Sequence, residues 1–236
     1  MAEPPALVLA AHGTRDPAGP PVLDALAAAV ADAAGARTRV AYVDVIAPTV
    51  AEVLAGVEGP VVVVPAFLAA GYHVRVDLPR QVEACGRGDV TIAPFLGPDG
   101  RLLAAVVERL TEAGWRPGDA VVLAAAGSSD ARALADVEVV ARALPLHVGV
   151  PVSVGYAATA TPTVPDAVRE ARAAGASRVA LASWLLAPGL FQSRLADAGS
   201  DVVAEPLGAH PAVVAAVVDR YRGMGVSEAA APPPGG

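Results

Sequence analysis

Short apolar runs alternate with longer amphipathic stretches along the whole chain. Runs rich in Val and Ala are typical of strands buried within a parallel sheet. We expect such strands at 6–11, 39–45, 61–67 and 90–94, and again at 120–125, 150–156, 178–184 and 201–205. The stretches between them predict helices at 20–34, 49–57, 76–86, 99–113, 131–144, 163–174, 189–198 and 211–222.

Strand–helix alternation of this kind predicts an α/β fold, in which helices cover both faces of a parallel sheet. Each half has enough strands for its own sheet, so we expect two similar domains, each with a four-stranded parallel sheet flanked by helices. The predicted domains are residues 1–114 and 115–226. Residues 227–236, which include a run of prolines, are expected to form a disordered tail.

The first strand and the loop after it occur twice in the sequence. Residues 7–16 read LVLAAHGTRD and residues 121–130 read VVLAAAGSSD, which places His12 opposite Ala126 at an offset of 114 residues. An internal duplication explains this similarity. Because the histidine is present in one copy only, the repeat predicts a single functional site in the first half.

A second repeated segment shows the same loss. PAFLAAGYH at 65–73 corresponds to ASWLLAPGLF at 182–191, so His73 lies opposite Phe191. The second half therefore retains the scaffold of the first without its histidines. We expect it to serve mainly as a wall of the site.

Composition excludes several classes of protein. No apolar run reaches the roughly 18–20 residues that span a bilayer. The N-terminal segment lacks the basic residues of a signal peptide, and the lone cysteine, Cys85, cannot form an internal disulfide. We therefore expect a cytoplasmic protein without a membrane partner.

The charged residues narrow the choice of ligands. All 17 basic residues are arginines, and the formal net charge is −7. Without lysine the chain can form neither a Schiff base nor a P-loop phosphate site. The net negative charge and the lack of a run of basic residues argue against a nucleic-acid partner. An anionic ligand would have to be bound by individual arginines.

Three polar residues lie at or just beyond the ends of three consecutive predicted strands. His12 comes directly after the first strand, Asp44 lies near the end of the second, and His73 follows the third after a short loop. Ligands of open α/β sheets bind beyond the carboxyl ends of the strands. The topology therefore predicts that these three side chains converge on one rim of the first sheet.

Two imidazoles and a carboxylate allow two kinds of chemistry. They suit a divalent cation such as cobalt(II), iron(II), nickel(II) or zinc, and they also suit proton transfer near neutral pH. An enzyme that inserts a metal ion into a macrocycle needs both functions, because it must deliver the metal and remove two pyrrole protons. A cleft between two α/β domains could accommodate a flat ring.

Two segments resemble the sirohydrochlorin chelatase family, the class II chelatases in their long, two-half form. These segments are AAHGTRDP at 10–17 and PAFLAAGYHVRVDLP at 65–79. The second segment is the more specific one. The resemblance covers roughly residues 6–222. It implies insertion of Co²⁺ or Fe²⁺ into sirohydrochlorin, with the metal as a substrate and no organic cofactor.

The resemblance also implies roles for individual residues. His12 and His73 would bind the incoming metal or accept pyrrole protons, and Asp44 would take the place of an acid that is commonly Glu in the family. The residues implied for binding the anionic tetrapyrrole are Arg15, Arg75, Arg80, Gly71 and Tyr72.

Other interpretations stay open. The same histidines could belong to a metal carrier or a tetrapyrrole-binding protein without turnover. A hydrolase is disfavoured, because the chain has no G-x-S-x-G nucleophile motif. Asp44 could cap a helix, and Arg75 and Arg80 could be solvated helix charges. The sequence does not choose between cobalt and iron, or between siroheme and cobalamin synthesis. A duplicated chain is expected to work as a monomer.

Overall fold

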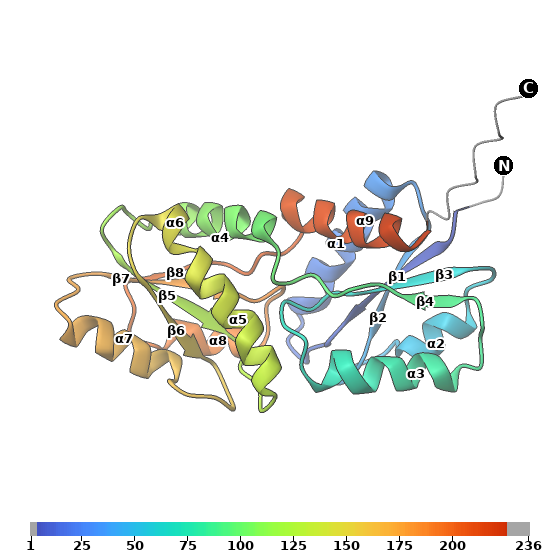
Figure 1. The fold of residues 1–236 in the computed structure, drawn as a ribbon, viewed down its shortest axis with the longest axis horizontal. Coiled ribbons are helices and arrows are strands. Elements are labelled where there is room, and N and C mark those ends of the chain that lie inside the picture. The colour runs from blue at the N-terminus through green and yellow to red at the C-terminus, as the bar shows by residue number, and fades with distance from the viewer. Residues whose placement is uncertain (1–3, 226–236) are drawn as a thin grey trace, which may run out of the picture.

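The computed structural model describes residues 4–225. They form two sheets, each of four parallel strands (Figure 1). The predicted α/β class is therefore confirmed. The first sheet has the order β2-β1-β3-β4 and the second the order β6-β5-β7-β8. The strands are β1 (Ala6–Ala11), β2 (Thr38–Tyr42), β3 (Val61–Pro65), β4 (Val90–Ile92), β5 (Ala120–Ala125), β6 (Val152–Tyr156), β7 (Val179–Trp184) and β8 (Val202–Val203).

The helices follow the predicted order, with two additions. A single π-helical turn, η1, precedes α3, and the short helix α6 follows α5. The helices are α1 (Gly19–Ala34), α2 (Val50–Ala55), η1 (His73–Asp77), α3 (Leu78–Ala84), α4 (Gly100–Glu112), α5 (Ala131–Ala143), α6 (Pro145–Val148), α7 (Val164–Ala173), α8 (Leu190–Ala196) and α9 (Pro211–Gly225). The tail predicted at 227–236 lies outside the described residues.

Strand β1 shows how the apolar runs build the core. Its residues are all buried, and alternate side chains point to opposite faces of the sheet. Leu7 and Leu9 pack into a core that continues into the second half, where it includes Leu123. Val8 packs instead into a separate core beneath α2 and α3. Burial on both faces explains why the strands have no polar alternation.

Two helices are exchanged between the halves (Figure 1). Helix α4 follows β4 of the first sheet but packs against β7, α5 and α6 of the second. Helix α9 follows β8 of the second sheet but packs against β3 and α1 of the first. The sequence boundary expected near residue 114 therefore does not coincide with a boundary in packing, since each half contributes one helix to the other.

Strand β2 is shorter than predicted, and this places Asp44 in a loop. The strand ends at Tyr42, and the chain then turns through Val45, whose φ is +76°. Thr159 has a φ of +66° at the corresponding place in the second half. The turn is thus part of the duplicated frame. No helix within residues 4–225 is long and apolar enough to cross a membrane.

Candidate metal and proton-transfer site

The structure brings the two predicted histidines together. His12 extends from the end of β1, and His73 begins η1 after the loop that follows β3. Their ring centroids lie 4.7 Å apart, and the ring planes are almost perpendicular at 83°. Neither residue is fully buried. The two imidazoles therefore form one accessible pair at the rim where the neighbouring strands β1 and β3 end.

The backbone fixes the protonation pattern of His12. Its Nδ1 lies 3.0 Å from the Gly13 carbonyl oxygen. A carbonyl oxygen only accepts hydrogen bonds, so Nδ1 carries the proton and donates it to this bond. In the neutral ring Nε2 then keeps its lone pair, which is the form that binds metal ions or accepts a proton.

A carboxylate orients His73 in the same way. Its Nδ1 lies 2.7 Å from Asp77 Oδ2, and both side chains are about one-third exposed or less. An ionised carboxylate can only accept, so Nδ1 donates and Nε2 is again free to bind. Histidines that bind metals commonly donate their other ring N–H to a carboxylate. Residues 73 and 77 share one π-helical turn, a rare element that often occurs at functional sites.

Gly13 allows the loop after β1 to approach the loop after β2. Its φ is +83°, and a Cβ atom at this position would overlap the Asp44 carbonyl oxygen. The backbone of Asp44 thus lies beside the His12 loop. Its exposed carboxylate accepts a hydrogen bond of 2.7 Å from the Val45 N–H. No hydrogen bond joins this carboxylate to either imidazole within the described residues.

The predicted substrate-binding residues differ in their surroundings. Arg15 and Arg80 are exposed, and no hydrogen bond or ion pair engages them within residues 4–225. The Arg75 Nε donates to the Ala70 carbonyl at 2.8 Å, so part of this guanidinium is used inside the protein. Tyr72 is 56% exposed and lies beside His73, with ring centroids 6.4 Å apart.

Gly71 lies where the first half contacts the second. A Cβ atom there would approach Ser128 Oγ to 3.3 Å, so the His73 loop packs closely against the loop after β5. The counterpart of this contact is present too, since a Cβ atom at Gly189 would approach Thr14 Oγ1 to 2.9 Å. The two halves therefore meet through reciprocal loop contacts. The site is at their junction.

The second half has apolar residues in place of His12, Asp44, His73 and Asp77. Ala126 corresponds to His12 and Ala158 to Asp44, at an offset of 114 residues. After β3 the two halves align at an offset of 118 residues. This follows from the strand register, because β3 pairs with β1 as β7 pairs with β5. Phe191 and Leu195 therefore replace the hydrogen-bonded pair His73 and Asp77.

The polar groups are too few for a closed metal site. Within the described residues, no group of three or more His, Cys, Asp or Glu side chains is arranged to hold a metal ion. Two imidazoles alone would bind a metal ion more weakly than a structural site with four protein ligands. A weak, open site is suited to passing a metal on.

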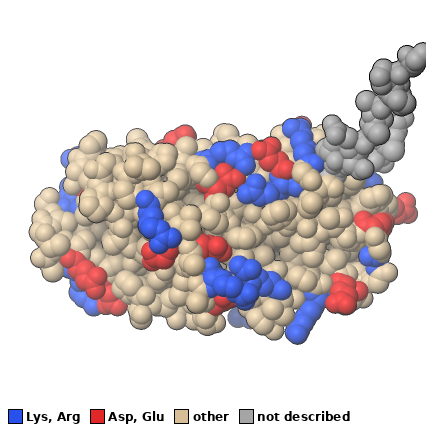
Figure 2. Space-filling view, viewed as in Figure 1, with Lys and Arg blue, Asp and Glu red and all other residues tan. Residues whose placement is uncertain are grey.

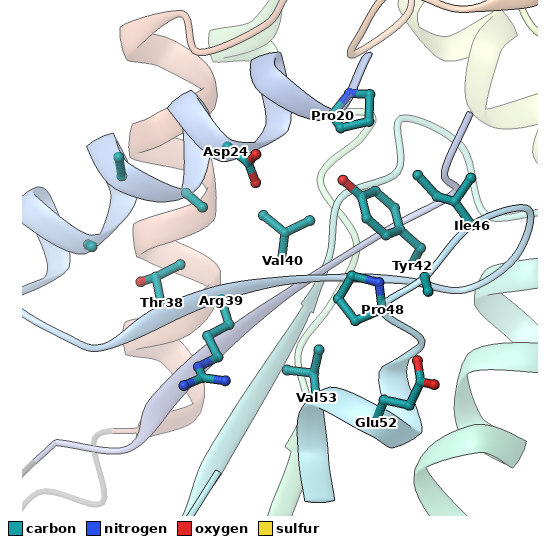
Figure 3. Close-up of a pocket in the computed structure, with 14 residues that line it drawn as sticks. Pro20, Asp24, Thr38, Arg39, Val40, Tyr42, Ile46, Pro48, Glu52 and Val53 are labelled. Carbon is teal, nitrogen blue, oxygen red and sulfur yellow. The ribbon is translucent and has the colours of Figure 1, made fainter. Parts of the chain in front are cut away.

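A pocket that neither histidine lines is shown in Figure 3. It has a volume of about 700 Å³ and lies between α1, the edge strand β2 and the start of α2. Tyr42 and Ile46 line it, while His12 and His73 do not. This pocket is not the histidine site, although Ile46 follows the Asp44 loop directly.

The tyrosine in this pocket belongs to the duplicated frame. Burial, together with the charge of Asp24, raises the pKa of Tyr42. Burial and the charge of Glu138 raise the pKa of Tyr156 in the second half in the same way. A buried tyrosine near an acidic residue is thus retained in both halves, whereas the histidines occur in one half only.

On the face shown in Figure 2, acidic and basic side chains are interspersed without a continuous basic surface.

Two features of the site were not predicted from the sequence. Asp77 stands four residues after His73, and this helical spacing could have identified the pair. The hydrogen bond from the Ala70 N–H to Asp136 joins residues 66 positions apart, so no local spacing in the sequence indicates it. At the start of α5, Asp130 is the N-cap and accepts a hydrogen bond from the Arg132 N–H.

Comparison with known families gives two matches along the chain. The family model described as CbiX matches residues 6–113 and again residues 120–224. One match falls on each half, in agreement with the internal duplication. No match was found among the curated proteins.

Solved structures share the fold over nearly the whole chain. SirB from Bacillus subtilis with Fe³⁺ is 20% identical with a TM-score of 0.76, covering 94% of this chain and 96% of SirB. The sirohydrochlorin chelatase SirB from Bacillus subtilis subspecies spizizenii in complex with cobalt is 20% identical with a TM-score of 0.74, covering 94% and 95%. CbiX, the terminal enzyme for siroheme biosynthesis in denitrifying bacteria, is 24% identical with a TM-score of 0.72, covering 93% and 99%. These structures establish a chelatase-like α/β fold.

Proposed function

Because the chain belongs to the CbiX family, we propose that it inserts a divalent metal ion, Co²⁺ or Fe²⁺, into sirohydrochlorin. Two of the similar structures are described as a sirohydrochlorin chelatase with cobalt and as an enzyme of siroheme biosynthesis. The observation that carries the proposal is the pair of imidazoles 4.7 Å apart, each with its Nδ1 on an acceptor.

The imidazole pair supports transfer of the metal. Neutral imidazole nitrogens are good ligands for Co²⁺ and Fe²⁺. With His12 and His73 as its protein ligands, the ion would keep other positions for water or for the ring nitrogens of the substrate. A chelatase must lose its metal to the macrocycle in every cycle, so few protein ligands are an advantage.

Metal insertion also requires removal of two protons from the macrocycle. The Nε2 atoms of His12 and His73 are acceptors once the metal has left them. Asp77 would stabilise the positive charge that forms on His73 when its ring gains a proton. We assign Asp44 as a further acceptor, because its exposed carboxylate lies in the neighbouring loop.

The surroundings of the pair suit a flat, anionic substrate. Arg15 and Arg80 are free to pair with carboxylates of sirohydrochlorin, and Arg75 has N–H groups left besides its bond to Ala70. Large apolar side chains are exposed at Tyr72 and at Leu190, its counterpart in the second half. We propose that these two side chains contact the faces of the macrocycle.

The test is a direct assay. Purified protein is mixed with sirohydrochlorin and Co²⁺, or anaerobically with Fe²⁺, and the change in tetrapyrrole absorbance is followed. The expected result is a rate above that of the spontaneous reaction that is lost in the His12→Ala/His73→Ala double variant. Binding without acceleration would favour a metal or tetrapyrrole carrier instead. Parallel assays with both ions would give the metal preference.

A further inference from the structure

The loop that carries His73 is held by the second half through polar contacts. The Ala70 N–H donates to Asp136 Oδ2 on α5 at 2.9 Å. Ala70 is 1% exposed, so the donor of this bond is shielded from water, while Asp136 is half-buried. The Ala70 carbonyl accepts from Arg75 Nε at 2.8 Å, and that nitrogen lies 4.0 Å from Asp130 Oδ2. We call these contacts the Ala70 clamp.

The corresponding loop of the second half has no such clamp. Pro188 takes the place of Ala70 and has no N–H to donate. Val22 takes the place of Asp136, and Ser193 takes the place of Arg75. The close contact of Gly189 with Thr14 is retained. Loop packing is thus shared by both sides of the junction, while the polar clamp exists only around the histidine.

We propose that Asp136 is a positioning residue that fixes the His73 imidazole relative to His12. The inference rests on the chelatase function proposed above and extends it to the second half, which supplies the anchor of the metal loop. Asp136 touches neither imidazole. It acts through the peptide of Ala70, three residues before His73.

The geometry explains why an anchor is needed. His12 is set directly on β1, a fully buried central strand. His73 lies beyond a loop, so its position depends on what holds residues 66–72. Two nitrogens can serve one metal ion only within a narrow range of distances, and misplacement by about 1 Å can cost 100-fold in rate. The clamp limits this movement.

The experiment compares Asp136→Ala with two further variants. Asp136→Asn keeps an amide oxygen that can accept from the Ala70 N–H and should restore function. Glu138→Ala is the matched control, because Glu138 lies on the same helix and pairs with Arg142 instead of the His73 loop. Asp136→Val, which copies Val22, is a second test of the lost acceptor if the alanine variant folds poorly.

Two measurements report on the clamp. In the metal-insertion assay, Asp136→Ala should lower kcat by about tenfold or more with little change in the KM for sirohydrochlorin. Asp136→Asn and Glu138→Ala should stay within about twofold of the unmodified protein. Amide hydrogen exchange, measured without substrate or metal, should be about tenfold faster at Ala70 in Asp136→Ala and Asp136→Val, but not in Asp136→Asn or Glu138→Ala.

The outcomes separate the two proposals. If the unmodified protein accelerates insertion but Asp136→Ala matches it in kcat and exchange, the clamp is overturned. Equal losses in the Asn and Ala variants would also overturn it, since charge and not hydrogen bonding would then matter. If the unmodified protein does not accelerate insertion but Asp136→Ala speeds exchange at Ala70, the anchor stands and the chelatase function fails.

Discussion

The two halves of this chain share a frame but differ in chemistry. Both have the same strand order, the same positive-φ turn after the second strand and the same close loop contacts. The first half has His12, Asp44 and the His73–Asp77 pair, and the second half has small or apolar residues at every one of these positions. Features present in both halves are therefore assigned to folding, and those present in one half to function.

This comparison also assigns a role to the half without histidines. It contributes Asp136 and Asp130, which hold the loop of His73, and it receives α4 as part of its own core. It is therefore more than the passive wall that the sequence indicated. Loss of the histidines from one copy leaves a single reactive site supported by two sheets.

The largest effect is expected when the first half is made to resemble the second at its reactive position. His73→Phe copies Phe191 and should lower the rate of metal insertion by at least about 100-fold, because it removes a metal ligand and proton acceptor. Thermal melting should change little, since His73 is partly exposed. The control is His147→Ala on α6, an exposed histidine outside the site. Retained activity in His73→Phe would place the reaction elsewhere.

Removing the partner of His73 should have the next largest effect. Asp77→Leu copies Leu195 and should weaken Co²⁺ binding by about 10- to 100-fold, because nothing then holds the ring with Nε2 free. The measurement is a titration of the protein with Co²⁺ without sirohydrochlorin. Asp77→Asn, whose amide oxygen can still accept from Nδ1, should lose less. Equal affinities in all three proteins would contradict the assigned role of Asp77.

Glycine substitutions should separate the shared frame from the site. Gly13→Ala and Gly127→Ala each place a Cβ atom against a backbone carbonyl at positive φ, so each should lower the free energy of unfolding by about 2–3 kcal/mol. Only Gly13→Ala should also lower the insertion rate at temperatures where both variants are folded. Gly149→Ala, with no atom within 4 Å of its Cβ, should cost only about 1 kcal/mol. Denaturant unfolding measures all three.

The smallest effect concerns the carboxylate of Asp99, which caps α4 and pairs with Arg101 on that helix and with Arg220 on α9. Hydrogen bonds from Arg101, opposed by burial and aided by Arg220, lower the pKa of Asp99 to about 2. A lowered folded pKa means that this stability is present above pH 4 and is lost as the pH falls towards 2. Asp99→Asn should therefore cost about 1–2 kcal/mol at pH 7 and almost nothing near pH 2. A deficit that does not depend on pH would contradict this assignment.

Much of the fold could be predicted because its signals are local. Each strand is a short apolar run that is followed by a helical stretch. The internal repeat then indicates two similar domains. The meeting of His12 and His73 followed from topology, since the strands before them are neighbours in a parallel sheet. The His73–Asp77 pair could also have been read from its spacing within one turn.

Other features depend on packing that the sequence does not display. The exchange of α4 and α9 depends on which sheet each helix covers, and hydrophobic periodicity marks only the buried face. Asp136 and Ala70 are distant in sequence and meet only because the halves dock in one particular way. The early end of β2 depends on the turn at Val45, a residue type that rarely has positive φ.

Because of the exchanged helices, this chain resembles a domain-swapped dimer whose two subunits are joined in one polypeptide. A fragment that stops at residue 114 would carry α4 without the sheet it covers, and it would leave β3 and α1 without α9. Two such fragments could each donate α4 to the other and restore both layers. Covalent linkage of the copies thus ensures that every histidine site is made together with its anchor, at any concentration of protein.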